Sequence, residues 1–183
     1  MSIATAVRVE PAETAATDIV ARVADVIVRE ASDDDADAVI ALIENVYAEF
    51  HGCVLLVDEE QPQLRAPQSA FARLGGKFWV AECQGRICGT VALTPTDAPR
   101  MARLSRLFIA DAARGRGLGE TLCQLVERTA RDEMGCDMMM LYTDSRFLGA
   151  HRLYERLGYA RQPGLMHCAD ASNSIEYVYT KKL

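Results

Sequence analysis

The chain has 183 residues, of which 50% are hydrophobic and 25% are charged. This length and balance are typical of one globular domain, with a core large enough to need no disulfide or metal. The formal net charge is −6, and such a surface repels phosphate backbones, so nucleic acid is excluded as a general partner. A local basic patch can still bind a small anion.

Six cysteines are scattered along the chain, and none belongs to a C-x-x-C pair. Because several fall inside predicted strands or helices, we interpret them as reduced, small hydrophobic residues. The first residues hold no lysine and no long apolar run, and acidic side chains interrupt any secretory or transit pattern. The sequence has no apolar stretch long enough to cross a membrane. We therefore expect a cytoplasmic protein without a membrane partner.

The start of the chain divides into an extension and a domain. Residues 1–25, rich in Ala, Val and Thr, are assigned to an N-terminal extension, either a loose tail or a short helix, and the domain is expected over 26–183. Residues 26–29 are short and β-branched, as in a strand. Residues 32–35 offer N-cap and first-turn acids, and apolar residues at helical spacing follow over 39–50, which predicts an amphipathic helix.

The remaining elements alternate between strands and helices. After an irregular segment at 53–76, in which 68–74 could form a short helix, strands are expected at 78–81, 87–93, 104–109, 138–142 and 175–180, and further strand structure is expected to begin at Tyr159. Further helices are expected at 119–134 and 147–157, the second ended by Gly158. This order predicts a mixed α/β domain.

The segment 108–119 runs from a strand through three alternate glycines into a helix. Glycines let backbone N–H groups converge, and the helix N-terminus adds a partial positive charge. With Arg114 and Arg116 beside it, this loop predicts an anion site that suits a pyrophosphate. It matches neither a P-loop nor a dinucleotide-binding fingerprint. Taken alone, the glycines also fit an ordinary strand-to-helix turn.

Two motifs in the second half resemble those of the GNAT superfamily of N-acetyltransferases. The family's cofactor signature, Arg/Gln-x-x-Gly-x-Gly/Ala, is matched by Arg114, Gly117 and Gly119 after the strand that holds residues 106–109. The family's A-x-x-L-Y-E-x-x-G-F segment is similar to residues 150–159, which read AHRLYERLGY. The spacing between the two motifs also fits the family, and the resemblance covers roughly residue 26 to the C-terminus.

The resemblance implies a fold and a cofactor. The fold is a mixed α/β sheet of about six to seven strands, splayed apart between its fourth and fifth strands and flanked by about four helices. The cosubstrate is acetyl-CoA, whose pantetheine arm pairs with the fourth strand while its pyrophosphate lies on the glycine loop. The implied cofactor-binding residues are Leu107, Phe108, Ile109, Arg114, Gly115, Arg116, Gly117, Leu118, Gly119 and Glu120.

The resemblance also implies direct attack of an amine on the thioester. A backbone N–H near Phe108 and Ile109 could stabilise the negative charge that develops on the thioester oxygen. The family motif places a tyrosine that protonates the departing thiolate, and Tyr154 matches that position, so Tyr154 is the expected catalytic residue. Without the motif, Tyr154 reads as an aromatic residue of the core.

The chain departs from the family at two positions. Many relatives carry a glutamate on the fourth strand that helps to deprotonate the amine, and this chain has Arg103 there. Glu82, Asp144, a water chain or an acceptor that arrives neutral remain as alternatives for the base. Arg103 could bind a carboxylate of the acceptor or form a surface salt bridge. Phe147 stands where many relatives have an asparagine.

The acceptor is expected to be a small-molecule primary amine in a pocket walled by residues 50–76. A protein or peptide N-acetyltransferase and a non-catalytic acyl-CoA-binding module are the alternatives, and a homodimer is compatible with the sequence. The three histidines lack metal-ligand spacing, so no metal is expected. His151 is expected on the helix surface or at the pocket rim, and His51 toward the acceptor.

Overall fold

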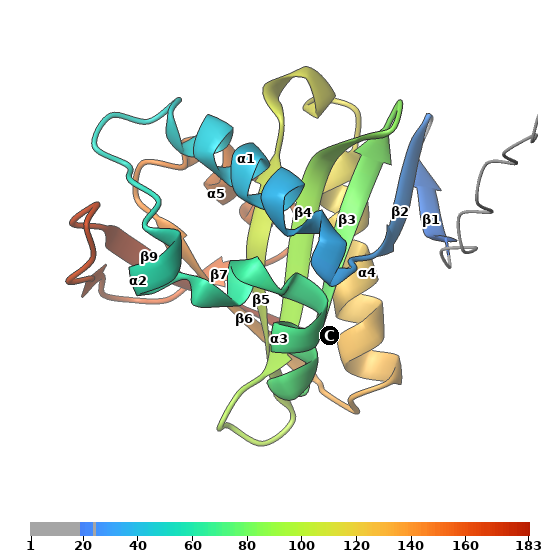
Figure 1. The fold of residues 1–183 in the computed structure, drawn as a ribbon. Helices are drawn as coiled ribbons and strands as arrows, with labels where there is room; N and C mark the ends of the chain where they lie inside the picture. Colours follow the sequence, from blue (N-terminus) through green and yellow to red (C-terminus); the bar gives the residue numbers. More distant parts are fainter. Residues whose placement is uncertain (1–18, 24) are drawn as a thin grey trace, which may run out of the picture.

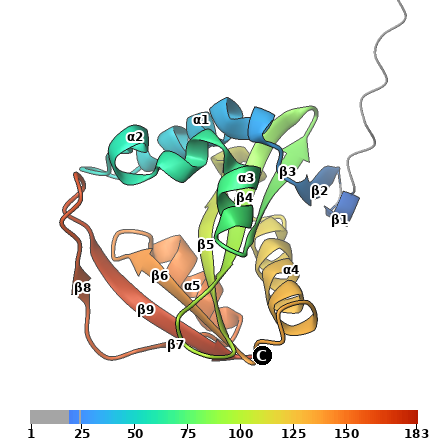
Figure 2. The ribbon, with the colours of Figure 1, turned by 60° about the horizontal axis from the view of Figure 1, so that its bottom comes forward.

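The computed structural model describes residues 19–23 and 25–183, which form one nine-stranded sheet with helices on both faces (Figures 1 and 2). The strands are β1 (Ile19–Val23), β2 (Val26–Glu30), β3 (Lys77–Cys83), β4 (Arg86–Pro95), β5 (Met101–Ile109), β6 (Met138–Asp144), β7 (Ala160–Arg161), β8 (Met166–His167) and β9 (Ile175–Lys182). The α-helices are α1 (Ala36–Tyr47), α2 (Val57–Glu60), α3 (Pro67–Arg73), α4 (Leu118–Asp132) and α5 (Leu148–Arg156). Short 3₁₀ turns occupy Asp33–Asp35, Pro62–Arg65 and Asp111–Ala113.

The strand order is β1-β2-β3-β4-β5-β6-β9-β7, and β8 pairs with β9. Neighbours are antiparallel except β5 and β6, which are parallel. The predicted mixed α/β fold is confirmed, with nine strands and five α-helices in place of about six to seven and about four. The strand structure expected from Tyr159 is β7, and the added strands are β1 at the sheet edge and β8, which has only two residues and is too short for a sequence pattern to show.

β1 revises the expected boundary of the domain. Residues 19–23 were assigned to the N-terminal extension as a tail or a helix, but they pair antiparallel with β2 and extend the sheet. Such an edge strand is decided by hydrogen bonds to its neighbour rather than by a buried face, so the alternation of its own residues did not reveal it. The rest of the extension, residues 1–18, and residue 24 lie outside the described residues.

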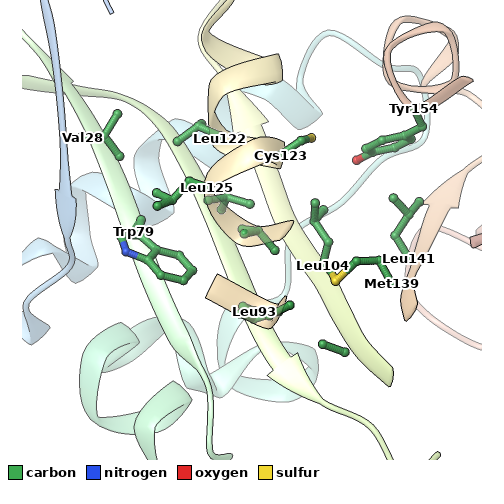
Figure 3. Close-up of a cluster of buried hydrophobic side chains, with 14 of the residues drawn as sticks. Val28, Trp79, Leu93, Leu104, Leu122, Cys123, Leu125, Met139, Leu141 and Tyr154 are labelled. Atoms are coloured by element: carbon green, nitrogen blue, oxygen red, sulfur yellow. The ribbon is translucent and has the colours of Figure 1, made fainter. Parts of the chain in front are cut away.

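Strand alternation divides the core between the two faces of the sheet. On one face, a single buried cluster contains Trp79 of β3, Leu122 and Val126 of α4, and Tyr154 of α5. In Figure 3, Trp79 and Tyr154 lie on opposite sides of α4. On the other face, Phe78 packs beneath α1 and α3. The helical spacing predicted for α4 is confirmed, because its apolar positions are buried.

The sheet splays between β5 and β6. These strands pair only where Met101–Arg103 lie beside Met138–Met140, and they separate beyond Arg103 (Figure 2). β6 pairs with β9 along its whole length, so beyond Arg103 its strand partner is β9 alone. The splay expected from the family resemblance is therefore present, and it leaves the far end of β5 without a strand on its β6 side.

A candidate active site at the splayed strands

Two cavities meet at the gap between β5 and β6. The loop cavity, about 530 Å³, lies beside the glycine loop and the start of α4. The covered cavity, about 320 Å³, lies beneath the segment that contains α2 and α3. Both cavities are lined by Leu107, Phe108, Phe147 and Ala150, so a molecule could extend from one into the other.

The loop cavity is lined by all of the predicted cofactor residues except Arg116, which is exposed and lies outside its wall. The last strand residues of β5 form one side, the glycine loop forms the end, and α5 forms the other side. The sequence did not assign the other residues that line this cavity, which lie in and after α1, beside the glycine loop, and in and just before α5: Val46, Phe50, Ala113, Phe147, Gly149, Ala150, Leu153 and Arg156.

The three glycines of the loop are required for different geometric reasons. Gly115 and Gly117 have φ angles of 73° and 83°, a left-handed conformation that strains other residues. At Gly119, an added Cβ would lie 3.0 Å from Cδ2 of Leu153 and 3.1 Å from Cδ1 of Ile109, so a side chain there would collide with its neighbours. The first intrahelical bond of α4 comes from the N–H of Thr121 to the carbonyl of Gly117. The N–H groups of residues 118–120 therefore have no acceptor within the helix, and these residues line the loop cavity. Free N–H groups at a helix N-terminus are what an anion site requires.

Arg114 does not present a free cation to this cavity. Its guanidinium donates to both carboxylate oxygens of Glu49, at 2.6 and 2.7 Å, and its Nε donates to the carbonyl of Ile109 at 2.9 Å. Arg114 thus ties the loop to the segment after α1 and to the end of β5. Both arginines were expected to add cationic reach, but among the described residues only Arg116 of the two is exposed without an ion-pair partner.

A β-bulge shapes β5 at the gap. Thr90 pairs with Phe108 and Ala92 pairs with Ser105, so Arg106 and Leu107 together lie opposite a single residue of β4. Arg106 has a φ of 54°, which is strained for a residue with a side chain. Its carbonyl accepts a 2.8 Å hydrogen bond from the buried hydroxyl of Thr90. Such a bulge redirects side chains, and here it turns Arg106 into the covered cavity.

The N–H of Ile109 faces the gap. The next residue, Ala110, donates its N–H to the carbonyl of Cys88 on β4, whereas the carbonyl of Ile109 is bonded by Arg114 on the opposite side. In a strand, the N–H and C=O of one residue point to the same side. The N–H of Ile109 therefore points away from β4 and toward the gap. The expected oxyanion donor has to point in this direction.

Tyr154 projects from α5 into the centre of the molecule. Its side chain is only 4% exposed, packs against the rings of Tyr159 and Tyr179, and lines the covered cavity. Its hydroxyl is directed toward α4, where Cys123 lies (Figure 3). Burial raises the pKa of the phenol above its usual range, so Tyr154 stays protonated at ordinary pH.

Hydrogen bonds between distant segments close the covered cavity. The amide and the carbonyl of Val54 both bond the hydroxyl of Ser172, at 2.8 and 3.1 Å, and the carboxylate of Glu60 accepts the N–H of Ala171 at 2.7 Å. Arg146 adds bonds to the carbonyls of His51 and Ser172, at 3.3 and 3.4 Å. The segment after α1 is thereby fastened to the loop between β8 and β9.

The covered cavity carries charges of both signs. Its carboxylates belong to Glu60, Asp144, Asp170 and Glu176, and its guanidinium groups belong to Arg103 and Arg106. Burial alone would raise the pKa of Asp144, but the hydrogen bonds from the side chain and amide of Arg146 outweigh it and lower that pKa. Burial raises the pKa of Glu176, and repulsion from Asp170 and Asp144 adds to the effect.

Arg106 is an unusual cation. Its Nε is inaccessible and has no hydrogen-bond partner, and among residues 19–23 and 25–183 its guanidinium forms no ion pair within 4.0 Å. Burial lowers its pKa, although a guanidinium remains charged at any working pH. The sequence did not single out Arg106 as a site residue, because nothing in its neighbourhood predicts a bulge.

Several expected site residues are placed differently. Glu82, a candidate base, is ion-paired with Arg29 at 3.2 Å on β3 and lines neither cavity. His151 was expected at the surface or rim, but it is buried, with Nε2 2.9 Å from the carbonyl of Asp144. His51 is exposed and lines neither cavity. Arg103 is exposed on the wall of the covered cavity.

Within residues 19–23 and 25–183, no three His, Cys, Asp or Glu side chains are grouped as metal ligands. Over the same residues, no helix combines the length and the apolar character needed to cross a membrane.

The splayed sheet, the bulge and the glycine loop are the arrangement expected of the GNAT family. The model of the Acetyltransferase (GNAT) family matches residues 40–159, and the chain belongs to this family. It is 31% identical over 149 residues to "Probable N-acetyltransferase camello" of Xenopus tropicalis, a match that covers 75% of this chain and 64% of that protein's length.

Solved structures share the fold. A GNAT-family acetyltransferase of Staphylococcus aureus Mu50 superposes with a TM-score of 0.74 and 22% identity, over 86% of this chain and 99% of the other. The protein yncA of Salmonella typhimurium, described as "a putative acetyltransferase" and solved with its cofactor acetyl-CoA, superposes with a TM-score of 0.66 and 19% identity, over 87% of this chain and 94% of the other.

Proposed function

We propose that this protein transfers an acetyl group from acetyl-CoA to the primary amine of a small molecule. The observation that carries the proposal is the junction of two cavities at the splayed strands, one ending on a glycine loop and the other covered. The family membership and the acetyl-CoA in the Salmonella relative support the choice of cosubstrate. The free cysteines of the described chain are consistent with the proposed cytoplasmic location.

Acetyl-CoA would occupy the loop cavity. Its pyrophosphate would accept hydrogen bonds from the amides at the start of α4, with Arg116 at the exposed side of the loop. Its pantetheine arm would lie along β5 from Ile109 toward Leu107, where β6 has turned away. The thioester would then reach the aromatic side chains of Phe108 and Phe147, at the junction of the two cavities.

The chemistry would take place at that junction. The amine nitrogen attacks the thioester carbon, and the N–H of Ile109 is positioned on the correct side of β5 to stabilise the negative oxygen. When the carbon–sulfur bond breaks, the thiolate needs a hydrogen-bond donor. Tyr154, protonated and buried on the wall of the covered cavity, is our proposed donor and general acid.

The covered cavity favours a compact acceptor. A volume of about 320 Å³ lies within the range of small-molecule sites, and hydrogen bonds from Val54 and Glu60 fasten its cover. A protein tail needs an open groove instead. The charges of the wall favour an acceptor that is amino-acid-like, with an anionic group near the unpaired guanidinium of Arg106 and an amine near the carboxylates.

A screen of acceptors tests this proposal. Amino acids, simple primary amines, polyamines and short peptides would be incubated with acetyl-CoA, and release of CoA would be followed with a thiol reagent. We expect turnover of small amines, fastest for those with a carboxylate. Efficient turnover of peptides alone would favour a protein acetyltransferase. Tight acetyl-CoA binding in calorimetry without any turnover would favour a non-catalytic binding module.

A further inference from the structure

The acceptor amine must lose a proton before it can react. Near neutral pH an aliphatic amine is mostly an ammonium ion, which has no free electron pair for the thioester. Arg103 stands on β5 where a glutamate would serve as the base, and a guanidinium cannot accept a proton. A carboxylate that lines the covered cavity is the group best suited to receive it.

Hydrogen bonds distinguish the carboxylates of the covered cavity. Asp144 is held by the guanidinium of Arg146, with Nε to Oδ1 at 2.9 Å and Nη2 to Oδ2 at 2.5 Å. Glu60 accepts the N–H of Ala171 at 2.7 Å, as part of the cover. Asp170 accepts the N–H of Ser174 at 2.8 Å.

Glu176 is the remaining carboxylate of this wall. Across the described ranges of the chain, no cationic side chain lies within 4.0 Å of it as an ion-pair partner, and the neighbour that can donate a hydrogen bond to it is the thiol of Cys168, a weak donor. It belongs to β9 and lies directly across from Asp144 in the antiparallel pair with β6. The two residues of such a pair project to the same face, so Glu176 faces the cavity beside Asp144.

The charged and titratable groups around Glu176 come from three directions. Asp144 lies on β6, Cys168 and Asp170 lie in the loop that leads into β9, and Arg106 lies across the gap on β5. Asp144 is ion-paired with Arg146, but it and Asp170 both disfavour a negative charge on Glu176, whereas Arg106 favours one. This arrangement leaves Glu176 as a half-buried carboxylate with room to exchange a proton.

We propose that Glu176 accepts the proton of the acceptor ammonium, which makes it a catalytic residue of this acetyl transfer; the inference rests on the proposed function. The N–H bond of the ammonium breaks and an O–H bond forms on the carboxylate, so the amine regains its electron pair. The amine nitrogen then bonds to the thioester carbon, and the carbon–sulfur bond breaks. The second nitrogen proton passes to the thiolate by way of Tyr154, and Glu176 returns its proton to solvent.

The electrostatics of the site agree with this role. Burial raises the pKa of Glu176, and Asp170 and Asp144 add to the effect; together they outweigh the hydrogen bond from Cys168 and the attraction of Arg106, which lower it. A base is most effective when its pKa lies close to the working pH, so the shift makes the carboxylate a better proton acceptor than an exposed glutamate. Asp144 has the opposite shift, which makes it a weaker base.

The test compares Glu176→Gln with the parent protein and with Glu44→Gln. Glu44 is exposed on α1 and outside both cavities, so its variant carries the same change in charge and is expected to keep the parent rate. The probes are the fastest amine of the acceptor screen and its β,β-difluoro analogue, whose nitrogen is far less basic and largely neutral at pH 8. Calorimetry with acetyl-CoA and urea denaturation would verify that all three proteins bind the cofactor and fold equally.

We expect Glu176→Gln to acetylate the basic amine about a hundredfold more slowly than the parent. The deficit should shrink to a few-fold for the difluoro analogue, since that amine needs no base. The rate of the variant should also keep rising with pH until the amine itself loses its proton.

Other results would overturn the role. An active parent together with an equally active Glu176→Gln removes Glu176 from the chemistry while the proposed function stands. An equal deficit for both amines assigns Glu176 to binding or structure instead. A parent that acetylates no amine at all refutes the proposed function, and the role of Glu176 with it.

Discussion

Replacing Arg146 by alanine should loosen the cover of the active site and destabilise the fold. The guanidinium of Arg146 bonds both carboxylate oxygens of Asp144 and reaches Ser174 and the carbonyls of His51 and Ser172. In Arg146→Ala, the carboxylate of Asp144 would keep only the 2.8 Å bond from the backbone N–H of residue 146. A nearly buried charge would then have lost its counter-ion.

The size of the effect follows from the exposure of the two partners. The side chain of Asp144 is 7% exposed and that of Arg146 is 27% exposed. Removing one partner of a fully buried pair costs about 3–5 kcal/mol. Because water can partly reach the site of the lost guanidinium, we expect the free energy of unfolding to fall by about 2–3 kcal/mol. For a domain of this size that corresponds to a melting temperature lower by about 4–12 °C.

The measurement is urea denaturation at pH 7, with Arg100→Ala as the matched control. Arg100 forms a 2.8 Å pair with Asp137, but these side chains are 65% and 48% exposed. An exposed pair contributes about 0–1 kcal/mol, so the control should unfold close to the parent. The double variant Arg146→Ala with Asp144→Asn should be less destabilised than the two single effects combined, because a neutral amide needs no cation.

The pH dependence has a defined sign. The pKa of Asp144 is lowered in the folded protein, so the stability from its ionised form is fully present above the pKa of an unfolded aspartate, about 4. That stability is lost as the pH falls through the lower folded value. The difference between parent and Arg146→Ala should therefore shrink below about pH 4. Unfolding free energies that agree within about 0.5 kcal/mol at pH 7 would refute the reasoning.

Three further predictions concern the two cavities. Gly117→Glu should abolish measurable acetyl-CoA binding in calorimetry. The control Gly135→Glu should bind normally, because Gly135 also has a left-handed φ and open space around it but lies outside the loop cavity. Equal binding by the two variants would refute the assignment of the glycine loop to the cofactor. Tyr154→Phe should lower turnover about a hundredfold with acetyl-CoA binding nearly unchanged, and unaltered turnover with chemistry rate-limiting would return Tyr154 to a packing role. Arg106→Met should raise the KM of acceptors that carry a carboxylate more than the KM of amines without one. The effect should exceed that of Arg103→Ala, because Arg103 is exposed. An equal effect on all acceptors would argue against an anion site at Arg106.

Local features of the site were readable in the sequence because they depend on neighbouring residues. The alternate glycines of residues 115–119 set a left-handed turn and begin α4 within a few positions. The apolar spacing of α4 predicted its buried face, and the motif around Tyr154 predicted its helix. Family resemblance added the splay between β5 and β6, which no local pattern contains.

The acceptor side was decided by the tertiary structure. The bonds between Val54 and Ser172 join positions 118 residues apart, and Glu176 meets the site because β9 pairs with β6. Sequence patterns report burial and turns over a few residues, but they do not report which distant polar groups satisfy one another. Arg103, Glu82 and Asp144 were therefore visible as charges. Only the fold showed which charges are paired, and that those of Arg106 and Glu176 face the cavity without an ion-pair partner among the described residues.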